Sequence, residues 1–318
     1  MADFDAAPDI DLEHLGVHRS VSTVFPPEEL IETLEDLPVT VSLVEDEDHN
    51  DTDCEAIVTF EHREWFADLE WVHSVQAGVD RFPMDVFERE GVVLTNSTGI
   101  HDRTVGETVA GYLLAFSRRL HRHVANQQRR EWTQPDWDEA FTLPGTTACV
   151  VGTGTLGQGV AEVAGSLGVS VRGVRRTPED VPGFDDIYTT DALLEAVSGV
   201  DFVVSTLPLT DETRGLLDAA VFEAMDEDAY VVNVGRGPVV DEAALIDALE
   251  ANKVAGAALD VFETEPLSSD SPLWAMDEVI VTPHSAAFTV DYYRDIAGLV
   301  RENVRRLEAG EAFTNRVV

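Results

Sequence analysis

The sequence predicts an α/β protein with two parallel sheets, and three observations lead to this prediction. The chain has 318 residues, a length that favours two domains over one compact core. Short apolar runs alternate with helical patterns along most of the chain, which is the order of elements in parallel sheets. A glycine-rich stretch, Gly152-Thr153-Gly154-Thr155-Leu156-Gly157, joins an apolar run to a helical pattern.

In the first third of the chain, four apolar runs read as buried strands. They are Val39–Val44, Ala56–Thr59, Trp71–Val75 and Val92–Thr95. Helical stretches lie between them, one beginning at Pro26-Pro27 and another ending at Glu90-Gly91. A long helical pattern then runs from about Arg103 to His121 and connects to the second part of the chain.

After Pro144-Gly145 the alternation continues with six candidate strands. They are Ala148–Val151, Val169–Val174, Asp201–Thr206, Tyr230–Val234, Gly256–Asp260 and Val279–Thr282. Six strands separated by crossover helices predict a Rossmann-type, doubly wound parallel sheet. The last pattern, Asp291 to Ala309, is one amphipathic helix, which we expect to return to the first domain.

Composition limits the class of protein. Apolar residues make up 44% of the chain, which is enough for real cores. No apolar run approaches the roughly 20 residues that span a bilayer, and the acidic N-terminus does not resemble a signal peptide. We therefore expect a cytoplasmic protein. Cys54 and Cys149 belong to no metal-binding pattern, so we expect no disulfide and no metal site.

The chain is strongly acidic, with 61 Asp and Glu against 21 Lys and Arg and a net charge of −40. Such a surface repels nucleic acids and anionic membranes, so we expect neither as a partner. The carboxylates are spread over the whole chain, which suggests adaptation to a very salty cytoplasm. At about 1 M salt the screening length falls to about 3 Å, so our hypothesis is that low salt loosens the fold.

The glycine-rich stretch has the context of a dinucleotide-binding turn. The apolar run Ala148–Val151 precedes it, and a helical pattern with Val160 and Val163 follows. The glycines allow a tight turn and let a pyrophosphate approach the backbone N–H groups at a helix N-terminus. A turn without a ligand is the alternative.

The residues after the next predicted strand bear on the choice of cofactor. A site for NAD places Asp or Glu there, whereas this chain has Arg175, Arg176 and Thr177. Two guanidinium groups and a hydroxyl suit the 2′-phosphate of NADP(H), so we predict that NADP(H) is preferred. Arginine pairs also occur elsewhere in the chain, and Glu179 lies just beyond, so NAD(H) use stays open.

Several separated motifs resemble the D-2-hydroxyacid dehydrogenases, most closely the glyoxylate/hydroxypyruvate reductases and broad 2-ketoacid reductases. They are Leu207-Pro208-Leu209-Thr210, Thr213-Arg214-Gly215, Asn233-Val234-Gly235-Arg236-Gly237-Pro238, Leu259-Asp260-Val261-Phe262-Glu263-Thr264-Glu265-Pro266 and Thr282-Pro283-His284. The likeness runs from about Val72 to His284. The family often has Ala at the position of Gly106 and Gly at that of Ala287, and we expect both changes to be tolerated.

This resemblance implies an NAD(P)-dependent reduction of 2-keto acids to D-2-hydroxy acids, and the chemistry of three residues agrees with it. Arg236 is always charged and binds a carboxylate through two bonds. His284 changes charge near neutral pH and can donate a proton to the carbonyl oxygen. Glu265 would orient the imidazole and favour its charged form. Taken alone, each of these three residues could have a purely structural role. For His62, His73 and His101 we expect a structural role.

The resemblance also implies ligand contacts in both domains. Contacts to the cofactor are expected from Gly152, Gly154, Thr155, Leu156, Gly157, Arg175, Arg176, Thr177, Thr206, Leu207, Pro208, Thr213, Val234, Gly235, Asp260 and Ala286. Asp260 would bond the nicotinamide carboxamide. The loop with Ala77 and Gly78 would bind the substrate carboxylate through its N–H groups. Residues 1–98 and 287–318 would form a smaller, flavodoxin-like substrate domain, and residues 99–286 the dinucleotide-binding domain.

The segment Thr59–Trp65 has one arginine among carboxylates, so we expect an unphosphorylated 2-keto acid. We expect no regulatory domain, which would argue against the phosphoglycerate dehydrogenases that carry one. Two alternatives use the same scaffold: an NAD(H)-sensing protein similar to the C-terminal-binding-protein corepressors, and a formate or phosphite dehydrogenase. The family usually forms homodimers, and Arg103 to Trp137 could make that contact.

Overall fold

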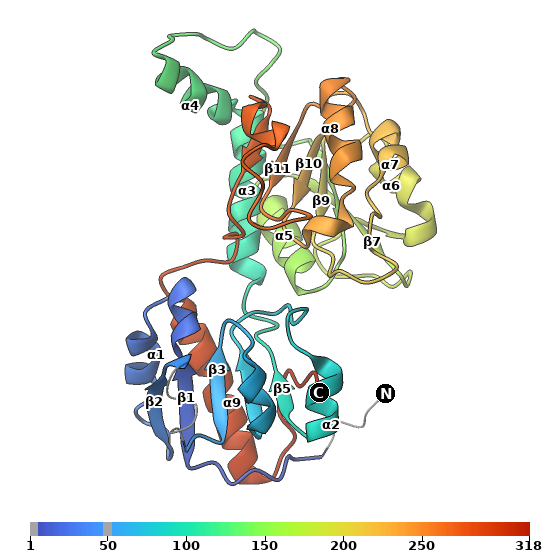
Figure 1. The fold of residues 1–318 in the computed structure, drawn as a ribbon. Coiled ribbons are helices and arrows are strands. Elements are labelled where there is room, and N and C mark those ends of the chain that lie inside the picture. Colours follow the sequence, from blue (N-terminus) through green and yellow to red (C-terminus); the bar gives the residue numbers. More distant parts are fainter. Residues whose placement is uncertain (1–5, 47–52) are drawn as a thin grey trace. The chain divides into compact units, whose positions relative to one another are not determined.

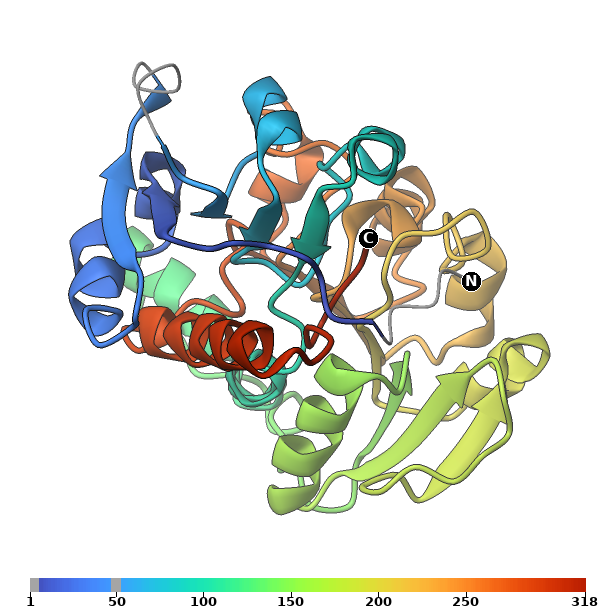
Figure 2. The ribbon, with the colours of Figure 1, turned by 90° about the horizontal axis from the view of Figure 1, so that it is seen from below.

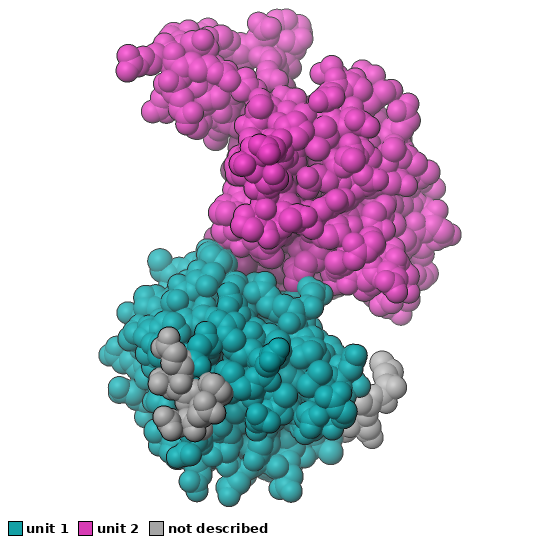
Figure 3. All heavy atoms as spheres, in the orientation of Figure 1, with its two compact units in different colours: residues 1–100, 288–318 teal, residues 101–287 magenta. Residues whose placement is uncertain are grey.

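The structure, a computed structural model, describes residues 6–46 and 53–318. It divides into two compact units, which Figure 3 colours separately. Unit 1 comprises Met1–Ile100 and Phe288–Val318, and unit 2 comprises His101–Ala287. The domain boundaries that we predicted, after residues 98 and 286, lie within two residues of these divisions. What each unit binds stays a prediction.

Unit 1 contains a parallel sheet of five strands in the order β2-β1-β3-β4-β5. The strands are β1 (His14–His18), β2 (Thr40–Val44), β3 (Ala56–Thr59), β4 (Trp71–Ser74) and β5 (Val93–Thr95). This order is that of the flavodoxin-like fold, whose switch point lies between β1 and β3. The predicted flavodoxin-like class of the smaller domain is therefore confirmed.

Strand β1 is the one strand of this sheet that the sequence patterns did not predict. It lies between β2 and β3 and buries Leu15 and Val17 completely. Its signal is weak because Gly16 separates the two apolar residues and histidines stand at both ends. A Cβ at Gly16 would lie 2.8 Å from a methyl group of Val44, so glycine fits this close approach.

The helices of unit 1 are α1 (Pro27–Thr33), α2 (Met84–Glu90) and α9 (Tyr292–Ala309), with short 3-10 helices at Arg19–Thr23 and Glu64–Asp68. The predicted return of the C-terminal helix is confirmed, because α9 packs against α1 in unit 1 (Figures 1 and 2). Its apolar face, which includes Ile296, Val300 and Val304, is buried in the core of the unit.

Unit 2 contains a parallel sheet of seven strands in the order β12-β11-β10-β9-β6-β7-β8. The strands are β6 (Thr147–Val151), β7 (Ser170–Arg175), β8 (Asp186–Thr189), β9 (Phe202–Ser205), β10 (Tyr230–Asn233), β11 (Gly256–Leu259) and β12 (Val279–Val281). Six of them correspond to predicted runs. The seventh, β8, was missed because it is an edge strand whose residues are at most half-buried, so it lacks an apolar pattern.

Helices cover both faces of this sheet, so the doubly wound architecture is confirmed. On one face lie α3 (Asp102–Ser117) and α5 (Thr155–Ser166). On the other lie α6 (Leu193–Val197), α7 (Ala219–Ala224) and α8 (Glu242–Glu250). Short 3-10 helices occupy Thr190–Ala192, Gly237–Val239 and Pro272–Ala275. Among the described residues, no helix is long and apolar enough to cross a membrane.

Two glycines set the approach of α3 to α5. A Cβ at Gly106 would lie 2.5 Å from the carbonyl oxygen of Gly159, and a Cβ at Gly159 would lie 2.0 Å from that of Asp102. Helix backbones in such contact leave no room for a side chain. Gly106 is therefore more than a tolerated departure from the family pattern.

The helical pattern from Arg103 to His121 is interrupted in the structure. Helix α3 ends at Ser117, and Arg119 has a φ of 56°, in the left-handed region. Helix α4 (Leu120–Arg129) starts in a new direction and buries none of its residues. Figure 1 shows α4 and the loop that follows it extending away from the sheet of unit 2.

Candidate active site

The glycine-rich turn lies between β6 and α5, and its three glycines have different surroundings. Gly152 has a φ of 104°, which side-chain-bearing residues rarely adopt. A Cβ at Gly157 would lie 2.0 Å from the Gly152 carbonyl oxygen, so this position admits only glycine. A Cβ at Gly154 would meet nothing within 4 Å. No side chain caps α5, so no side-chain oxygen accepts from its first N–H groups.

The loops after β9 and β10 border this turn. Thr206 follows β9, and its hydroxyl donates to the Gly152 carbonyl at 2.8 Å. A Cβ at Gly235 would lie 2.5 Å from the carbonyl oxygen of Leu207, so the two loops touch through backbone. The Thr213 hydroxyl donates to the carbonyl of Pro208 at 2.7 Å and closes the loop between them. Together with Val234, these predicted cofactor residues lie at one edge of the sheet.

The predicted phosphate residues follow β7. Arg175 ends the strand, is half-buried, and donates to the backbone carbonyl of Glu179 at 3.3 Å. Its guanidinium lies 3.5 Å from the Glu179 carboxylate. Arg176 and Thr177 are exposed, and Arg176 forms no ion pair with the residues that the structure describes. One of the two guanidinium groups is thus open to a phosphate.

Arg236 follows β10 in a turn that a buried asparagine organises. The amide nitrogen of Asn233, which is 1% exposed, donates to the Arg236 carbonyl at 3.1 Å, and its oxygen accepts from the N–H of Gly235 at 3.2 Å. The half-buried guanidinium donates to the Gly235 carbonyl at 2.8 Å. We did not single out Asn233 from the sequence, although it stands within the matching motif.

His284 and Glu265 meet, as we predicted from their motifs. The imidazole Nδ1 lies 2.8 Å from Glu265 Oε2, and the N–H of Phe262 donates to Oε1 at 3.2 Å. Burial raises the pKa of Glu265, but the hydrogen bond and charge of His284, with help from Arg236, outweigh it and lower the pKa overall. Nε2 of His284 has no hydrogen-bond partner among the residues that the structure describes, so it can bond a substrate.

The turn that carries His284 has an unusual backbone. His284 has a φ of 53°, in the left-handed region, where residues other than glycine pay a conformational cost. Its N–H donates to the Asp260 carbonyl at 2.8 Å. The Asp260 carboxylate, 1% exposed, accepts from the N–H groups of Ser285 and Ala286, each at 2.9 Å. Asp260 therefore shapes this turn directly.

Three hydroxyl groups that we did not single out from the sequence hold the same turn. Thr282 donates to Asp260 Oδ1 at 2.6 Å, and Tyr112 lies 2.6 Å from the Thr282 hydroxyl. Thr108 donates to the Ala286 carbonyl at 2.9 Å. Tyr112 and Thr108 belong to α3, about 170 residues earlier in the chain, and the predicted helical pattern gave no sign of either contact.

The predicted substrate loop belongs to unit 1 and follows β4. Ala77 and Gly78 are half-buried. The Asn96 amide donates to the Ala77 carbonyl at 2.7 Å, which orients this peptide. The N–H groups of Ala77 and Gly78 find no acceptor among the described residues, so they are available to an anion.

No group of three or more metal-ligating side chains occurs among the residues that the structure describes. The arrangement after the strands of unit 2 is instead a cradle of backbone N–H groups beside a carboxylate, an imidazole and a guanidinium. Such a set binds an anionic dinucleotide and moves a proton to or from a nearby oxygen.

Comparisons with known proteins agree with this geometry. Residues 110–286 match the model of the D-isomer specific 2-hydroxyacid dehydrogenase, NAD binding domain. Glyoxylate/hydroxypyruvate reductase B of Escherichia fergusonii is 34% identical over 251 residues, which cover 77% of this chain and 76% of that protein.

Two solved structures are similar over nearly the whole chain. A D-isomer specific 2-hydroxyacid dehydrogenase from Xanthobacter autotrophicus Py2, in complex with NADPH and MES, has a TM-score of 0.80 at 31% identity. An NADPH-dependent glyoxylate/hydroxypyruvate reductase from Sinorhizobium meliloti, in complex with NADP and sulfate, has a TM-score of 0.80 at 28% identity. Each alignment covers 96% of this chain and 98% of the other. The chain thus belongs to the D-isomer specific 2-hydroxyacid dehydrogenase family of oxidoreductases, with a nicotinamide-dinucleotide-binding domain.

Proposed function

We propose that this protein reduces an unphosphorylated 2-keto acid to the D-2-hydroxy acid with NADPH. His284 donates the proton, Glu265 orients the imidazole of His284, and Arg236 binds the carboxylate and carbonyl of the substrate. The observation that carries the proposal is the 2.8 Å contact between Glu265 Oε2 and His284 Nδ1, with Nε2 left without a partner among the described residues.

The nicotinamide, when bound, supplies the hydride that reduces the carbonyl carbon. Glu265 accepts from Nδ1–H, which leaves the second proton of the imidazolium on Nε2. His284 then gives this proton to the carbonyl oxygen, so the keto acid gains one hydride and one proton and becomes the hydroxy acid. In the reverse direction, neutral His284 accepts the hydroxyl proton at Nε2.

Arg236 of unit 2 and, separately, Ala77 and Gly78 of unit 1 are the residues that we propose for binding the substrate. Arg236 bears a permanent charge. The N–H groups of Ala77 and Gly78 have no acceptor among the described residues, which leaves them for an anion. The domain roles follow: residues 1–98 and 287–318 bind the substrate, and residues 99–286 bind the dinucleotide. Asp260 keeps acceptor capacity on its carboxylate for the nicotinamide carboxamide, since Oδ2 accepts one bond within the turn.

The preference for NADP(H) rests on the residues after β7. Arg176 is exposed and without an ion pair among the described residues. Arg175 has two long contacts with Glu179, 3.3 Å to its carbonyl and 3.5 Å to its carboxylate. The two solved relatives named above carry NADPH and NADP. NADH would also bind, because nothing in the pyrophosphate cradle requires the 2′-phosphate.

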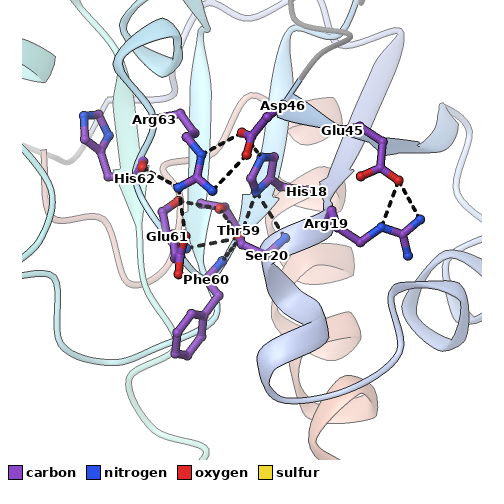
Figure 4. A network of polar contacts seen from close by, with 10 residues as sticks. All are labelled: His18, Arg19, Ser20, Glu45, Asp46, Thr59, Phe60, Glu61, His62 and Arg63. Carbon is purple, nitrogen blue, oxygen red and sulfur yellow. Dashed lines mark hydrogen bonds and ion pairs between the residues drawn. The ribbon is translucent and has the colours of Figure 1, made fainter. Parts of the chain in front are cut away.

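The exclusion of phosphorylated substrates rests on Arg63, the one arginine of the segment after β3. Figure 4 shows its guanidinium between two carboxylates. It donates to both oxygens of Asp46, at 2.6 and 3.0 Å, and to Glu61 at 2.9 Å. The pKa of Asp46 is lowered, mainly by the hydrogen bond from Arg63 and also by His18. A guanidinium so neutralised offers little to a phosphate, so glyoxylate, hydroxypyruvate or another small 2-keto acid fits better.

We also propose that the protein is a homodimer built on α4 and the loop after it. Trp132 and Trp137 are 98% and 94% exposed, and Val124 is 56% exposed. Residues 108–130 contain five arginines and no acidic residue in a chain of net charge −40. Exposed aromatic and basic side chains would complement the acidic surface of a second copy.

The first experiment follows the absorbance at 340 nm in molar salt with NADPH or NADH and with pyruvate, glyoxylate or hydroxypyruvate. We expect oxidation of NADPH that falls by about 10²–10⁴-fold in His284→Ala. The variant Glu223→Gln, which removes an exposed carboxylate that pairs with Lys253, is a control for charge loss. Tight NADPH binding without turnover of any keto acid would contradict the proposal. That result would favour a dinucleotide-sensing protein. If the protein instead oxidised formate or phosphite, it would be a formate or phosphite dehydrogenase.

A further inference from the structure

The turn from Thr282 to Ala286, called here the His284 turn, is held at both ends by side chains of α3. Tyr112 reaches the hydroxyl of Thr282 at its start, and Thr108 donates to the carbonyl of Ala286 at its end. Tyr112 and Thr108 are four residues apart on one helix, so they lie on the same face.

The direction of these hydrogen bonds follows from the number of protons. Thr282 donates its single hydroxyl proton to the carboxylate of Asp260 at 2.6 Å. Its oxygen can then only accept from Tyr112, so the chain runs from Tyr112 through Thr282 to Asp260. Burial raises the pKa of Tyr112 to about 12, which keeps the proton on the phenol throughout the neutral range.

We infer that Tyr112 and Thr108 are positioning residues for the reaction, acting through the His284 turn. They fix the turn that presents the imidazole of His284, and this inference rests on the proposed role of His284 as proton donor. No motif of the sequence analysis included either residue.

The backbone of the turn explains why such support matters. The φ of 53° at His284 is costly for a residue with a side chain, so the surrounding bonds must hold it. The Asp260 carboxylate accepts two of these hydrogen bonds from backbone N–H groups, and its own orientation depends on Thr282. Removing the Tyr112 hydroxyl takes one support from this series without touching the imidazole or Glu265.

The test compares Tyr112→Phe, Thr108→Val and Thr282→Val with the conservative Thr282→Ser. Phenylalanine keeps the ring of Tyr112 in the core and removes only the hydroxyl, so packing and hydrogen bonding are separated. Tyr188→Phe is the matched control, because the Tyr188 hydroxyl has no partner among the described residues. All variants are studied as full-length protein.

Two readouts are measured on each variant. Hydrogen exchange of the Ser285 and Ala286 amides should be about fivefold faster in Tyr112→Phe, the factor for a hydrogen bond of about 1 kcal/mol. The kcat with glyoxylate should fall by about 10- to 100-fold, the size expected of a misplaced catalytic group. The KM for NADPH should change by a smaller factor, because the glycine-rich turn and the residues after β7 stay intact. Thr282→Ser should behave as the unaltered protein, and Tyr188→Phe likewise.

The outcomes separate this inference from the proposed function. Unchanged exchange at Ser285 and Ala286 in Tyr112→Phe and Thr108→Val would overturn the inference whether or not the protein is active. Faster exchange with an unchanged kcat would also overturn it, since the support would not serve catalysis. If the unaltered protein turns over no keto acid, the proposed function fails, while the exchange rates still decide whether α3 holds the turn.

Discussion

Alanine in place of Gly106 should destabilise the protein, although alanine is the better helix former. Gly106 lies in α3, and the added Cβ would sit 2.5 Å from the carbonyl oxygen of Gly159 and 2.9 Å from a methyl group of Val163. Ordinary contacts of this kind are about 3.5–4.0 Å, so the two helices must separate. Overpacking of this severity costs about 3 kcal/mol. The better helix propensity of alanine offsets about 1 kcal/mol of this cost, so the free energy of unfolding should fall by about 2 kcal/mol.

The same helix offers a matched control. Gly111 also lies in α3, but it is exposed and a Cβ there would meet nothing within 4 Å. Gly111→Ala should therefore gain about 1 kcal/mol from propensity alone. The two variants differ by one methyl group at two positions of one helix, so the gap of about 3 kcal/mol between them measures the helix contact itself.

Thermal unfolding by circular dichroism in molar salt measures both effects. For a domain of this size, about 1 kcal/mol shifts the Tm by about 2–4 °C. We expect Gly106→Ala to melt about 4–8 °C below the unaltered protein and Gly111→Ala slightly above it. A Gly106→Ala protein that is as stable as Gly111→Ala would refute the close packing of α3 on α5.

Four further predictions follow from the structure. Burial lowers the pKa of His73 to about 3, so the native state binds fewer protons than the unfolded state between about pH 6.5 and pH 3. The contribution of His73 to the free energy of unfolding is present above pH 6.5 and is lost on acidification, by about 2 kcal/mol from pH 7 to pH 5. Denaturant unfolding at both pH values should show this loss in the unaltered protein and not in His73→Gln. The double variant Arg175→Ala/Arg176→Ala should raise the KM for NADPH about 10- to 100-fold and leave that for NADH nearly unchanged in steady-state assays. The Tm should rise from dilute buffer to molar salt, because screening relieves the repulsion of a net charge of −40. Trp132→Glu/Trp137→Glu should shift the mass by light scattering from dimer to monomer, because both side chains are almost fully exposed on the loop after α4.

Each of these has an opposite result that would count against it. A stability slope between pH 7 and pH 5 that is the same with and without His73 would remove the role of that buried imidazole. An equal rise in the KM for NADPH and for NADH would show that the two arginines do not bind the 2′-phosphate. A Tm independent of salt would end the hypothesis of adaptation to a salty cytoplasm. A monomeric mass of the unaltered protein at high salt would dispose of the proposed dimer.

Most of the fold could be predicted because parallel strands that are buried on both faces read as continuous apolar runs. Strands β3, β6 and β10 illustrate this, since all their residues, apart from the first of β6, are buried. Strand β1 was missed because glycine and histidines dilute its apolar signal, and β8 because it is a half-exposed edge. The break between α3 and α4 was missed because Arg119 adopts a left-handed backbone that its side chain does not signal.

The placement of the candidate site residues could also be predicted in part, while their chemical roles stay predictions. The sequence by itself determined which residues follow each strand, and parallel strands bring such residues to one edge of the sheet. Glu265 and His284 meet for this reason, although 19 positions separate them. Only the tertiary structure decided that Tyr112 supports Thr282, that Arg63 is neutralised by Asp46, and that Gly106 admits no side chain. Such contacts depend on the distance between two elements to within about half an ångström, because hydrogen bonds and van der Waals repulsion change steeply over that range, and no local pattern of residues encodes it.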